Sequence, residues 1–91
     1  MVYAERIRDK LTAAFAPTVL EVADESHRHA GHGGAQPGGE THFTVTMVSD
    51  SFAGQSRVQR QRAVYQVLEA ELKERVHALA LNLATPEEAQ K

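Results

Sequence analysis

The chain has 91 residues, 42% of them hydrophobic, with a formal net charge of −2 and no cysteine. This length predicts a single domain over residues 1–91, because a second domain would be too small to bury its own core. The missing cysteines exclude disulfides, thiolate-bound zinc and a thiol nucleophile, and no apolar run approaches the roughly 20 residues of a membrane span. The N-terminus has no signal or transit pattern, so we expect a cytoplasmic protein with no membrane association.

The first quarter of the chain predicts a helix followed by a strand. Apolar side chains recur at helical spacing over residues 3–15, and Pro17 ends the helix. A run rich in β-branched residues then predicts a strand over 19–25. The apolar positions of the helix are Tyr3, Ile7, Leu11, Ala14 and Phe15.

A long loop and a second strand are predicted next. Residues 27–40 contain five glycines, one proline and three histidines, and a loop of this length in a small domain is usually functional or disordered. Residues 41–48 alternate between apolar and polar side chains, which predicts a half-buried strand paired with the first as a hairpin. The face expected to be buried carries Phe43, Val45 and Met47.

The second half of the chain begins with a turn over 49–54, in which we expect Phe52 to be buried and Gly54 to adopt an unusual backbone angle. Ser56 has the character of an N-cap for a helix over 57–75. At about 100° per residue, the apolar side chains of this helix form one stripe, which we expect to be buried. The stripe consists of Val58, Tyr65, Leu68, Leu72 and Val76.

The chain closes with a strand and a short helical tail. Residues 76–83 alternate like a strand, and Thr85 followed by Pro86 has the pattern of a helix start. The order α-β-β-α-β predicts the α+β class, with a three-stranded mixed sheet and both helices on one face. The crossover makes the second and third strands parallel and the connection right-handed, and it leaves the other face of the sheet open to a partner.

Several short blocks stand in order between Ile7 and Pro86. They are Leu20-Glu21-Val22, Asp24-Glu25-Ser26, Gly39-Glu40-Thr41-His42-Phe43, Val48-Ser49, Phe52-Ala53-Gly54, Arg60-Gln61-Arg62, Val64-Tyr65 and Val76-His77-Ala78-Leu79-Ala80-Leu81. Together they resemble the BolA-like family, which implies an α-β-β-α-β fold similar to class II KH domains. One position departs from the family, because Gln61 stands where histidine is frequent, and an amide takes up no proton near neutral pH. Gln61 is expected to face inward or toward the sheet edge.

The histidines can be interpreted in two ways from their pattern alone. Three of the five lie within the glycine-rich loop, namely His27, His29 and His32. They are either metal ligands or a solvated group that binds stray nickel or copper weakly. His77 stands at the rim of the apolar face of the last strand, as a ligand or as a partly buried histidine bonded to a backbone carbonyl. His42 is expected to be an exposed or edge-strand histidine that supports the loop, and not a ligand.

The resemblance to BolA-like proteins assigns a role to these histidines. The family is thought to hold a shared [2Fe-2S] cluster through a histidine of the C-terminal strand, which corresponds to His77. The second ligand comes from the loop, where the resemblance points to His29, with His32 and His27 as rivals. The implied partner is a monothiol glutaredoxin, which supplies one cysteine and the thiol of bound glutathione. We therefore expect an adaptor in iron–sulfur trafficking or iron-dependent regulation, and not an enzyme.

A DNA-binding transcription regulator is the alternative that the KH-like fold and the family's regulatory role imply. The candidate surface is the helix start, where Arg57, Arg60 and Arg62 concentrate and a helix N-terminus can receive a phosphate. A balance of 10 basic and 12 acidic residues is untypical of a dedicated nucleic-acid binder, and the turn lacks the Gly-x-x-Gly loop of KH modules. The sequence leaves open whether the free domain forms a weak homodimer.

Overall fold

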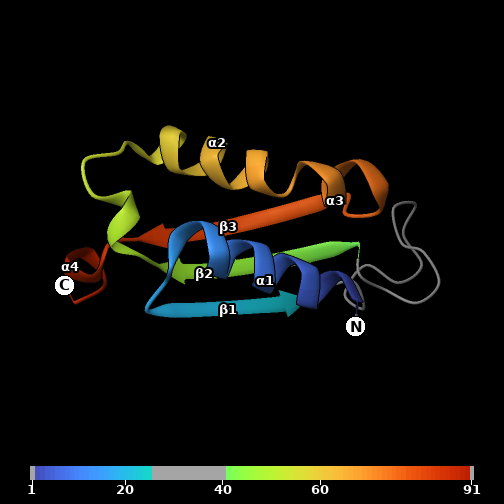
Figure 1. Ribbon diagram of the computed structural model, residues 1–91, viewed down its shortest axis with the longest axis horizontal. Helices are drawn as coiled ribbons and strands as arrows, with labels where there is room; N and C mark the ends of the chain where they lie inside the picture. Colours follow the sequence, from blue (N-terminus) through green and yellow to red (C-terminus); the bar gives the residue numbers. More distant parts are fainter. Residues whose placement is uncertain (1, 26–40, 91) are drawn as a thin grey trace.

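The computed structural model describes residues 2–25 and 41–90, and Figure 1 shows their arrangement. The predicted α+β class and the order of elements are confirmed. The glycine-rich loop predicted over 27–40 lies outside the described residues. The elements are α1 (Val2–Phe15), β1 (Val19–Asp24), β2 (His42–Val48), a 3-10 helix (Asp50–Phe52), α2 (Arg57–Val67), α3 (Glu69–Glu74), β3 (Ala78–Ala84) and α4 (Pro86–Ala89).

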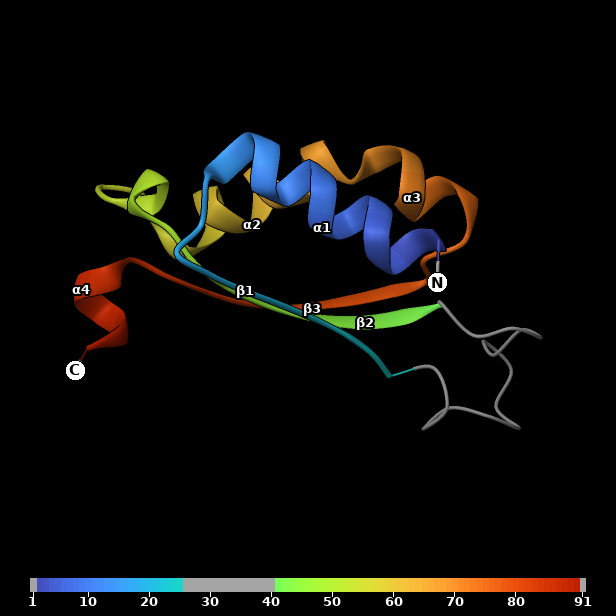
Figure 2. The same ribbon diagram turned by 60° about the horizontal axis from the view of Figure 1, so that its bottom comes forward.

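The three strands form one mixed sheet in the order β1-β2-β3. β1 pairs antiparallel with β2, and β2 pairs parallel with β3, so that Val45 lies between Val22 on one side and Leu81 on the other. The predicted hairpin and parallel crossover are both confirmed. Figure 2 shows α1, α2 and α3 together on one face of this sheet, as the pattern predicted.

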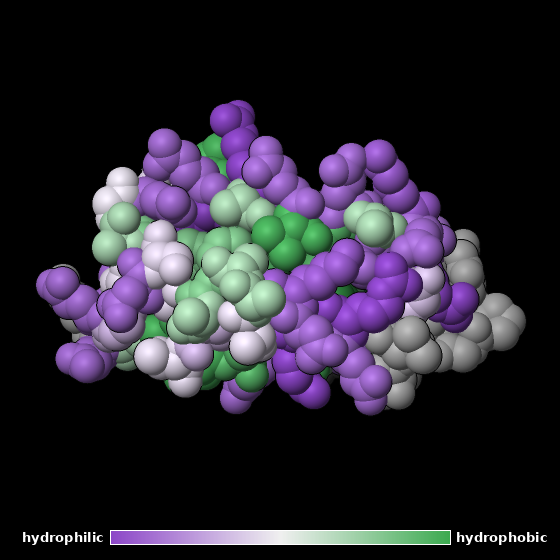
Figure 3. Space-filling view, in the orientation of Figure 1, coloured by the Kyte–Doolittle hydropathy of each residue, from purple (hydrophilic) through white to green (hydrophobic). Residues whose placement is uncertain are grey.

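The core lies between that face of the sheet and the helices. The alternation predicted for β2 is confirmed, because Phe43, Val45 and Met47 are at most 2% exposed while the residues between them are half-buried. Figure 3 shows that hydrophobic side chains reach the surface along the seam between α1 and α2, and that hydrophilic ones cover the outer side of α2 and α3. The other fully buried core side chains are Ile7, Leu11, Phe52, Val64 and Leu68.

The turn after β2 ties the end of α1 to the sheet. The hydroxyl of buried Ser49 donates to the carbonyl of Phe15 over 2.6 Å, and the ring of Phe15 lies 5.3 Å from that of Phe52. Gly54 has φ of 77°, a backbone conformation that favours glycine. The predictions for Phe52 and Gly54 are therefore confirmed.

The predicted stripe of the long helix is wrong at two positions. Val58 is 53% exposed and Tyr65 is 40% exposed, whereas the buried side of α2 carries Val64. At 100° per residue, Val58 and Tyr65 lie about 100–120° away from Val64 around the helix axis. Tyr65 instead lies over the edge of the sheet, where its hydroxyl donates to the carbonyl of Leu79 over 3.3 Å.

The helix predicted over 57–75 is also divided. α2 ends at Val67, and α3 begins at Glu69, with Leu68 between them. The N-cap is confirmed, because the hydroxyl of Ser56 accepts the Gln59 N–H over 3.2 Å and the Gln59 side chain accepts the Ser56 N–H in return.

The end of the chain follows the prediction closely. β3 begins at Ala78, two residues later than expected, and buried Val76 precedes it outside the strand. α4 has the predicted start, because the Thr85 hydroxyl accepts the Glu88 N–H over 3.2 Å and Pro86 occupies the first helical turn.

Candidate functional site

His77 lies directly before β3, at the end of the sheet where β2 begins. Its backbone N–H donates to the carbonyl of Thr41 over 2.8 Å, and the N–H of Ala78 donates to the same oxygen over 3.2 Å. Thr41 is buried, and it is the first described residue after the segment that carries the three loop histidines. His77 itself is exposed. The interpretation of His77 as a partly buried histidine is therefore wrong.

His42 lies at the same end of the sheet, but in a different setting from the one predicted. It is half-buried in the central strand, opposite Ala78, and its ring Nδ1 lies 2.8 Å from the hydroxyl of Thr41. The expectation of an exposed or edge-strand histidine is wrong, because β3 pairs with the side of β2 that would otherwise be an edge. The carbonyl of His42 accepts the N–H of Glu25 over 2.7 Å, which holds the strand ends that lead into and out of the loop together.

The three loop histidines, His27, His29 and His32, lie outside the described residues, so the structure does not choose between them. Within residues 2–25 and 41–90, no group of three or more histidine, cysteine, aspartate or glutamate side chains is arranged to hold a metal ion. Of the two described histidines, His42 is half-buried and His77 is exposed, and imidazole is a ligand type suited to borderline metals.

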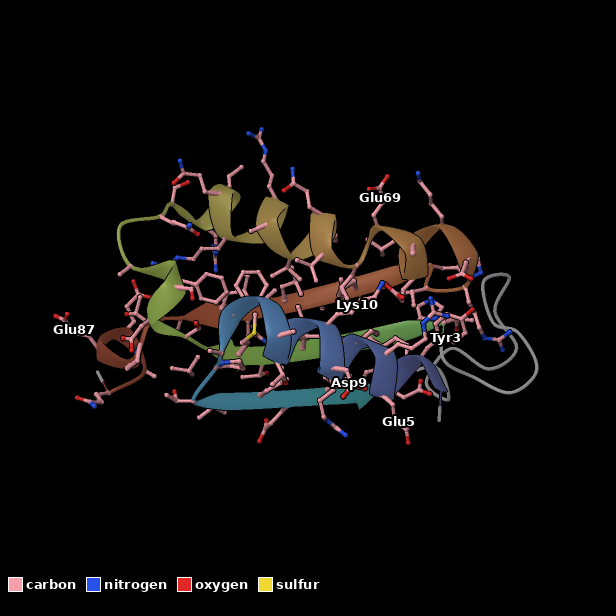
Figure 4. All side chains as sticks on the ribbon, viewed as in Figure 1. Tyr3, Glu5, Asp9, Lys10, Glu69 and Glu87 are labelled. Atoms are coloured by element: carbon pink, nitrogen blue, oxygen red, sulfur yellow. The ribbon has the colours of Figure 1, made fainter. Side chains whose placement is uncertain are left out.

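The helix that precedes His77 in the sequence, α3, carries a buried carboxylate. Glu71 of α3 is fully buried, and its Oε2 lies 2.6 Å from Nη2 of Arg6, while Nζ of Lys10 is 2.9 Å from both of its oxygens. Figure 4 shows Lys10 directed from α1 toward α3, whereas Glu5 and Asp9 point to the other side of α1. Burial raises the pKa of Glu71, but the hydrogen bonds from Lys10, from its own backbone and from Arg6, together with the charge of Lys10, outweigh it and hold the pKa below its ordinary value.

Sequence reasoning missed Glu71, although a signal for it exists. Glu71 follows Val64 and Leu68 at spacings of seven and three residues, which places its side chain on the buried face of a helix. On α1, Arg6 and Lys10 stand four residues apart and therefore share a face. An acidic residue on a buried stripe and two basic residues on a facing helix are the pattern of a buried ion cluster.

The predicted DNA-contacting arginines differ in their availability. Arg57 and Arg62 are exposed, but Arg60 is held by both oxygens of Glu88 at 2.6 and 3.0 Å and also donates to the carbonyl of Gln55. The Glu88 carboxylate raises the pKa of Arg60, against a smaller opposite effect of burial. Arg60 is therefore a structural contact between α2 and α4, and DNA contact by Arg57, Arg60 and Arg62 stays a prediction.

A cleft of about 300 Å³ lies beside this contact. Half-buried Gln61 lines it together with Leu83 of β3, in agreement with the expectation that Gln61 faces inward or toward the sheet edge. The other lining residues are Gln55, Arg57, Arg60 and Glu88.

Comparison with known proteins identifies the family to which this fold belongs. The family model of BolA-like proteins matches residues 11–88. The chain belongs to the BolA-like family. The DNA-binding transcriptional regulator BolA of Escherichia coli (strain K12) is 48% identical over 88 residues, which cover 97% of this chain and 80% of that protein.

A second BolA relative is much longer. SufE-like protein 1, chloroplastic/mitochondrial, from Arabidopsis thaliana is 48% identical over 87 residues, which cover 91% of this chain but only 24% of that protein. The chain thus spans about a quarter of that relative. The solved BolA domain of SufE1 from Arabidopsis thaliana has a TM-score of 0.85 at 47% identity and 93% coverage of both chains. The likeness to class II KH domains stays a prediction.

Two observations bear on the cellular location of the BolA-like chain. Among the described residues, no helix is long and apolar enough to cross a membrane. Some relatives are named as chloroplastic or mitochondrial proteins, so the cytoplasmic location stays a prediction. The Escherichia coli relative is named as a DNA-binding transcriptional regulator.

Proposed function

We propose that this BolA-like domain is an adaptor that binds a monothiol glutaredoxin and shares a [2Fe-2S] cluster with it, in iron–sulfur trafficking or iron-dependent regulation. The observation that carries the proposal is the position of His77. It is exposed, and its backbone is hydrogen-bonded to Thr41, directly after the segment with the other candidate ligands. Membership of the BolA-like family supports the same role.

The donor set of the chain fits half of such a cluster. Thiolates are the usual ligands of [2Fe-2S] clusters, and two histidines can replace two of them on one iron, which raises the reduction potential. A chain without cysteine can contribute only the nitrogen half. His77 and one loop histidine, with His29 first and His32 and His27 as rivals, would supply it, and the glutaredoxin cysteine and glutathione would supply the sulfur.

The residues around His77 would prepare it for this role. Two N–H groups, those of His77 and Ala78, donate to one carbonyl oxygen of buried Thr41, so the backbone beside the imidazole is anchored to the central strand. The exposure of His77 leaves it open to a second protein. A candidate ligand that is fixed at its backbone and exposed to solvent suits an interface in which the partner brings the remaining ligands.

The test is to mix the domain with a cluster-loaded monothiol glutaredoxin and record the visible circular dichroism spectrum. We expect the spectrum to change with the wild type, to stay that of the glutaredoxin alone with His77→Ala, and to change partly with His29→Ala. His42→Gln is the matched control, because His42 is half-buried and bonded to Thr41, and it should behave like the wild type. An unchanged spectrum with the wild type contradicts the proposal.

DNA binding is a second candidate, favoured by the name of the Escherichia coli relative, which is 48% identical. Because Arg60 is paired with Glu88, exposed Arg57 and Arg62 are the arginines left from the predicted set. Duplex binding through them would weaken steeply with added salt, since each phosphate contact releases counterions. The double variant Arg57→Gln/Arg62→Gln should then lower the salt dependence, and a wild type that binds no duplex near physiological salt excludes this function.

A further inference from the structure

Glu71 connects α1, α3 and the segment that follows α3, through its side-chain carboxylate and its backbone carbonyl. Its side chain accepts from Arg6 and Lys10 of α1. Its backbone carbonyl accepts from the N–H groups of Arg75, at 3.1 Å, and Val76, at 3.0 Å. One residue of α3 therefore fixes both the position of this helix against α1 and the path of the chain that leaves it.

The path continues without a break to His77. Val76 is buried with 2% exposure, and the next residue, His77, donates its N–H to the carbonyl of Thr41. The chain between α3 and β3 is thus held at Glu71 on one side and at Thr41 on the other. The imidazole of His77 is carried by the last residue of this held segment before the strand.

Stability alone is a weak explanation for a buried carboxylate at this place. Removing a charge from water costs several kcal/mol, and replacing a buried ion group with well-packed apolar residues is often neutral or stabilising. α3 has only six residues, and a helix of that length has little stability of its own. What two cations on one carboxylate provide is a fixed orientation of this short helix.

We propose that Glu71 is a positioning residue for His77, which holds the α3–β3 connection so that the imidazole meets the partner's cluster in one geometry. This inference rests on the proposed function. Glu71 contacts no ligand itself, and its effect passes through its own carbonyl and through the orientation of α3. Arg6 and Lys10 extend the same effect to α1, whose first turns lie beside α3 (Figures 1 and 2).

The variant that separates positioning from stability is Glu71→Met. It keeps the length of the side chain and leaves no cation buried without a partner, because the side chains of Arg6 and Lys10 are 34% and 40% exposed and Arg6 still reaches Glu74 at 2.8 Å. We expect the melting temperature to stay the same or rise. We expect amide hydrogen exchange at Val76, His77 and Ala78 to become faster, with no change at Val45 in the centre of the sheet.

The functional readout is the spectral titration with a cluster-loaded monothiol glutaredoxin. We expect Glu71→Met to weaken the apparent affinity about 10-fold, the lower end of the loss seen when groups that orient a metal ligand are removed. Glu71→Gln should restore part of it, because an amide oxygen can still accept from Lys10. Glu69→Met is the matched control on the same helix, since Glu69 is 65% exposed and pairs with Lys73 of its own helix.

The outcomes separate the two proposals. If the wild type gives no spectral change, the proposed function fails, while the exchange rates at Val76 and His77 still test the anchoring by Glu71. If the wild type responds and Glu71→Met matches it in exchange and affinity, the positioning role is overturned. Faster exchange throughout the sheet would also overturn it, because that pattern marks a general loss of stability. If Glu71→Met does not fold, Glu71→Gln gives the comparison, with a smaller expected loss of affinity and a smaller rise in exchange at Val76 and His77.

Discussion

The two ends of the sheet each carry an ionic contact between distant parts of the chain, but the two contacts differ in burial. At the end where β2 begins, the side chain of Glu71 is 1% exposed between Arg6 and Lys10. At the end where β2 finishes, Arg60, whose side chain is 12% exposed, meets Glu88, whose side chain is 47% exposed. Breaking a buried pair leaves a charge without water, whereas an exposed pair is worth little.

This difference agrees with what each end presents to other molecules. Beside the buried cluster lies the exposed His77, next to the segment that contains the other candidate ligands. At the opposite end, the Glu88 carboxylate accepts two hydrogen bonds from the guanidinium of Arg60, which attaches the short α4 to α2. The Glu71 contact orients His77, a candidate ligand, whereas the Glu88 contact pairs with Arg60, a candidate DNA-binding residue.

The largest effect should come from leaving Glu71 without its cations. In the double variant Arg6→Ala/Lys10→Ala, a buried carboxylate loses both partners, and an unpaired buried charge costs about 3–5 kcal/mol at neutral pH. Urea unfolding measures this loss. Arg8→Ala/Lys73→Ala removes the same charge from exposed positions and is the control. Equal losses in the two variants would show that Glu71 does not depend on its neighbours.

Acidification should weaken the same contact, in a range set by the pKa of Glu71. This pKa is lowered in the folded protein from its ordinary value of 4.5, so the native state favours the charged form. Its stabilising contribution is complete above that ordinary value and disappears as the pH falls through the lower folded value. The difference in unfolding free energy between the wild type and Glu71→Gln should become smaller when the pH is lowered below 4.5. A difference that stays constant there would contradict the pKa shift.

A moderate effect is expected at the opposite end of the sheet from the loss of the cap of α2. Ser56 accepts the Gln59 N–H, and replacing such a cap with alanine costs about 1 kcal/mol of stability. Ser56→Ala should therefore lower the urea midpoint, and Ser56→Asp should restore it, because aspartate caps equally well. If Ser56→Asp were as unstable as Ser56→Ala, the hydrogen bond would not be the cause.

Most of the fold could be predicted because its signals are local. The alternation of Phe43, Val45 and Met47 and the caps at Ser56 and Thr85 each depend on a few neighbouring residues. The wrong stripe on α2 has a physical reason, because a wheel that counts only apolar residues gives weight to Val58 and none to the buried Glu71.

The site was less predictable because its contacts join residues far apart in sequence. Lys10 and Glu71 are separated by 61 residues, and Arg60 and Glu88 by 28, so no local pattern connects them. The proposed ligand role of His77 came from the family resemblance, whereas its exposure and its anchor to Thr41 came from the structure. The choice among His29, His32 and His27 stays a prediction, since they lie outside the described residues.

The smallest effect should follow from breaking the exposed contact with Glu88→Gln. The glutamine oxygen can still accept the Thr85 N–H, as Glu88 does at 3.0 Å, so the start of α4 is kept while the charge is lost. Exposed ion pairs contribute about 0–1 kcal/mol, and salt screens them. The variant should therefore lose less stability than Ser56→Ala, and the loss should disappear at high salt.

Glu87→Gln is the control for this variant, because Glu87 is the exposed neighbour in the same helix. Suppose that Glu88→Gln loses as much stability as expected for the Glu71 cluster, and that salt does not change this loss. The Arg60–Glu88 contact would then contribute as much as a buried ion pair. The contrast between the two ends of the sheet would then not hold. If the loss is small and screened, the attachment of α4 varies with the ionic strength, as expected for the more exposed of the two contacts.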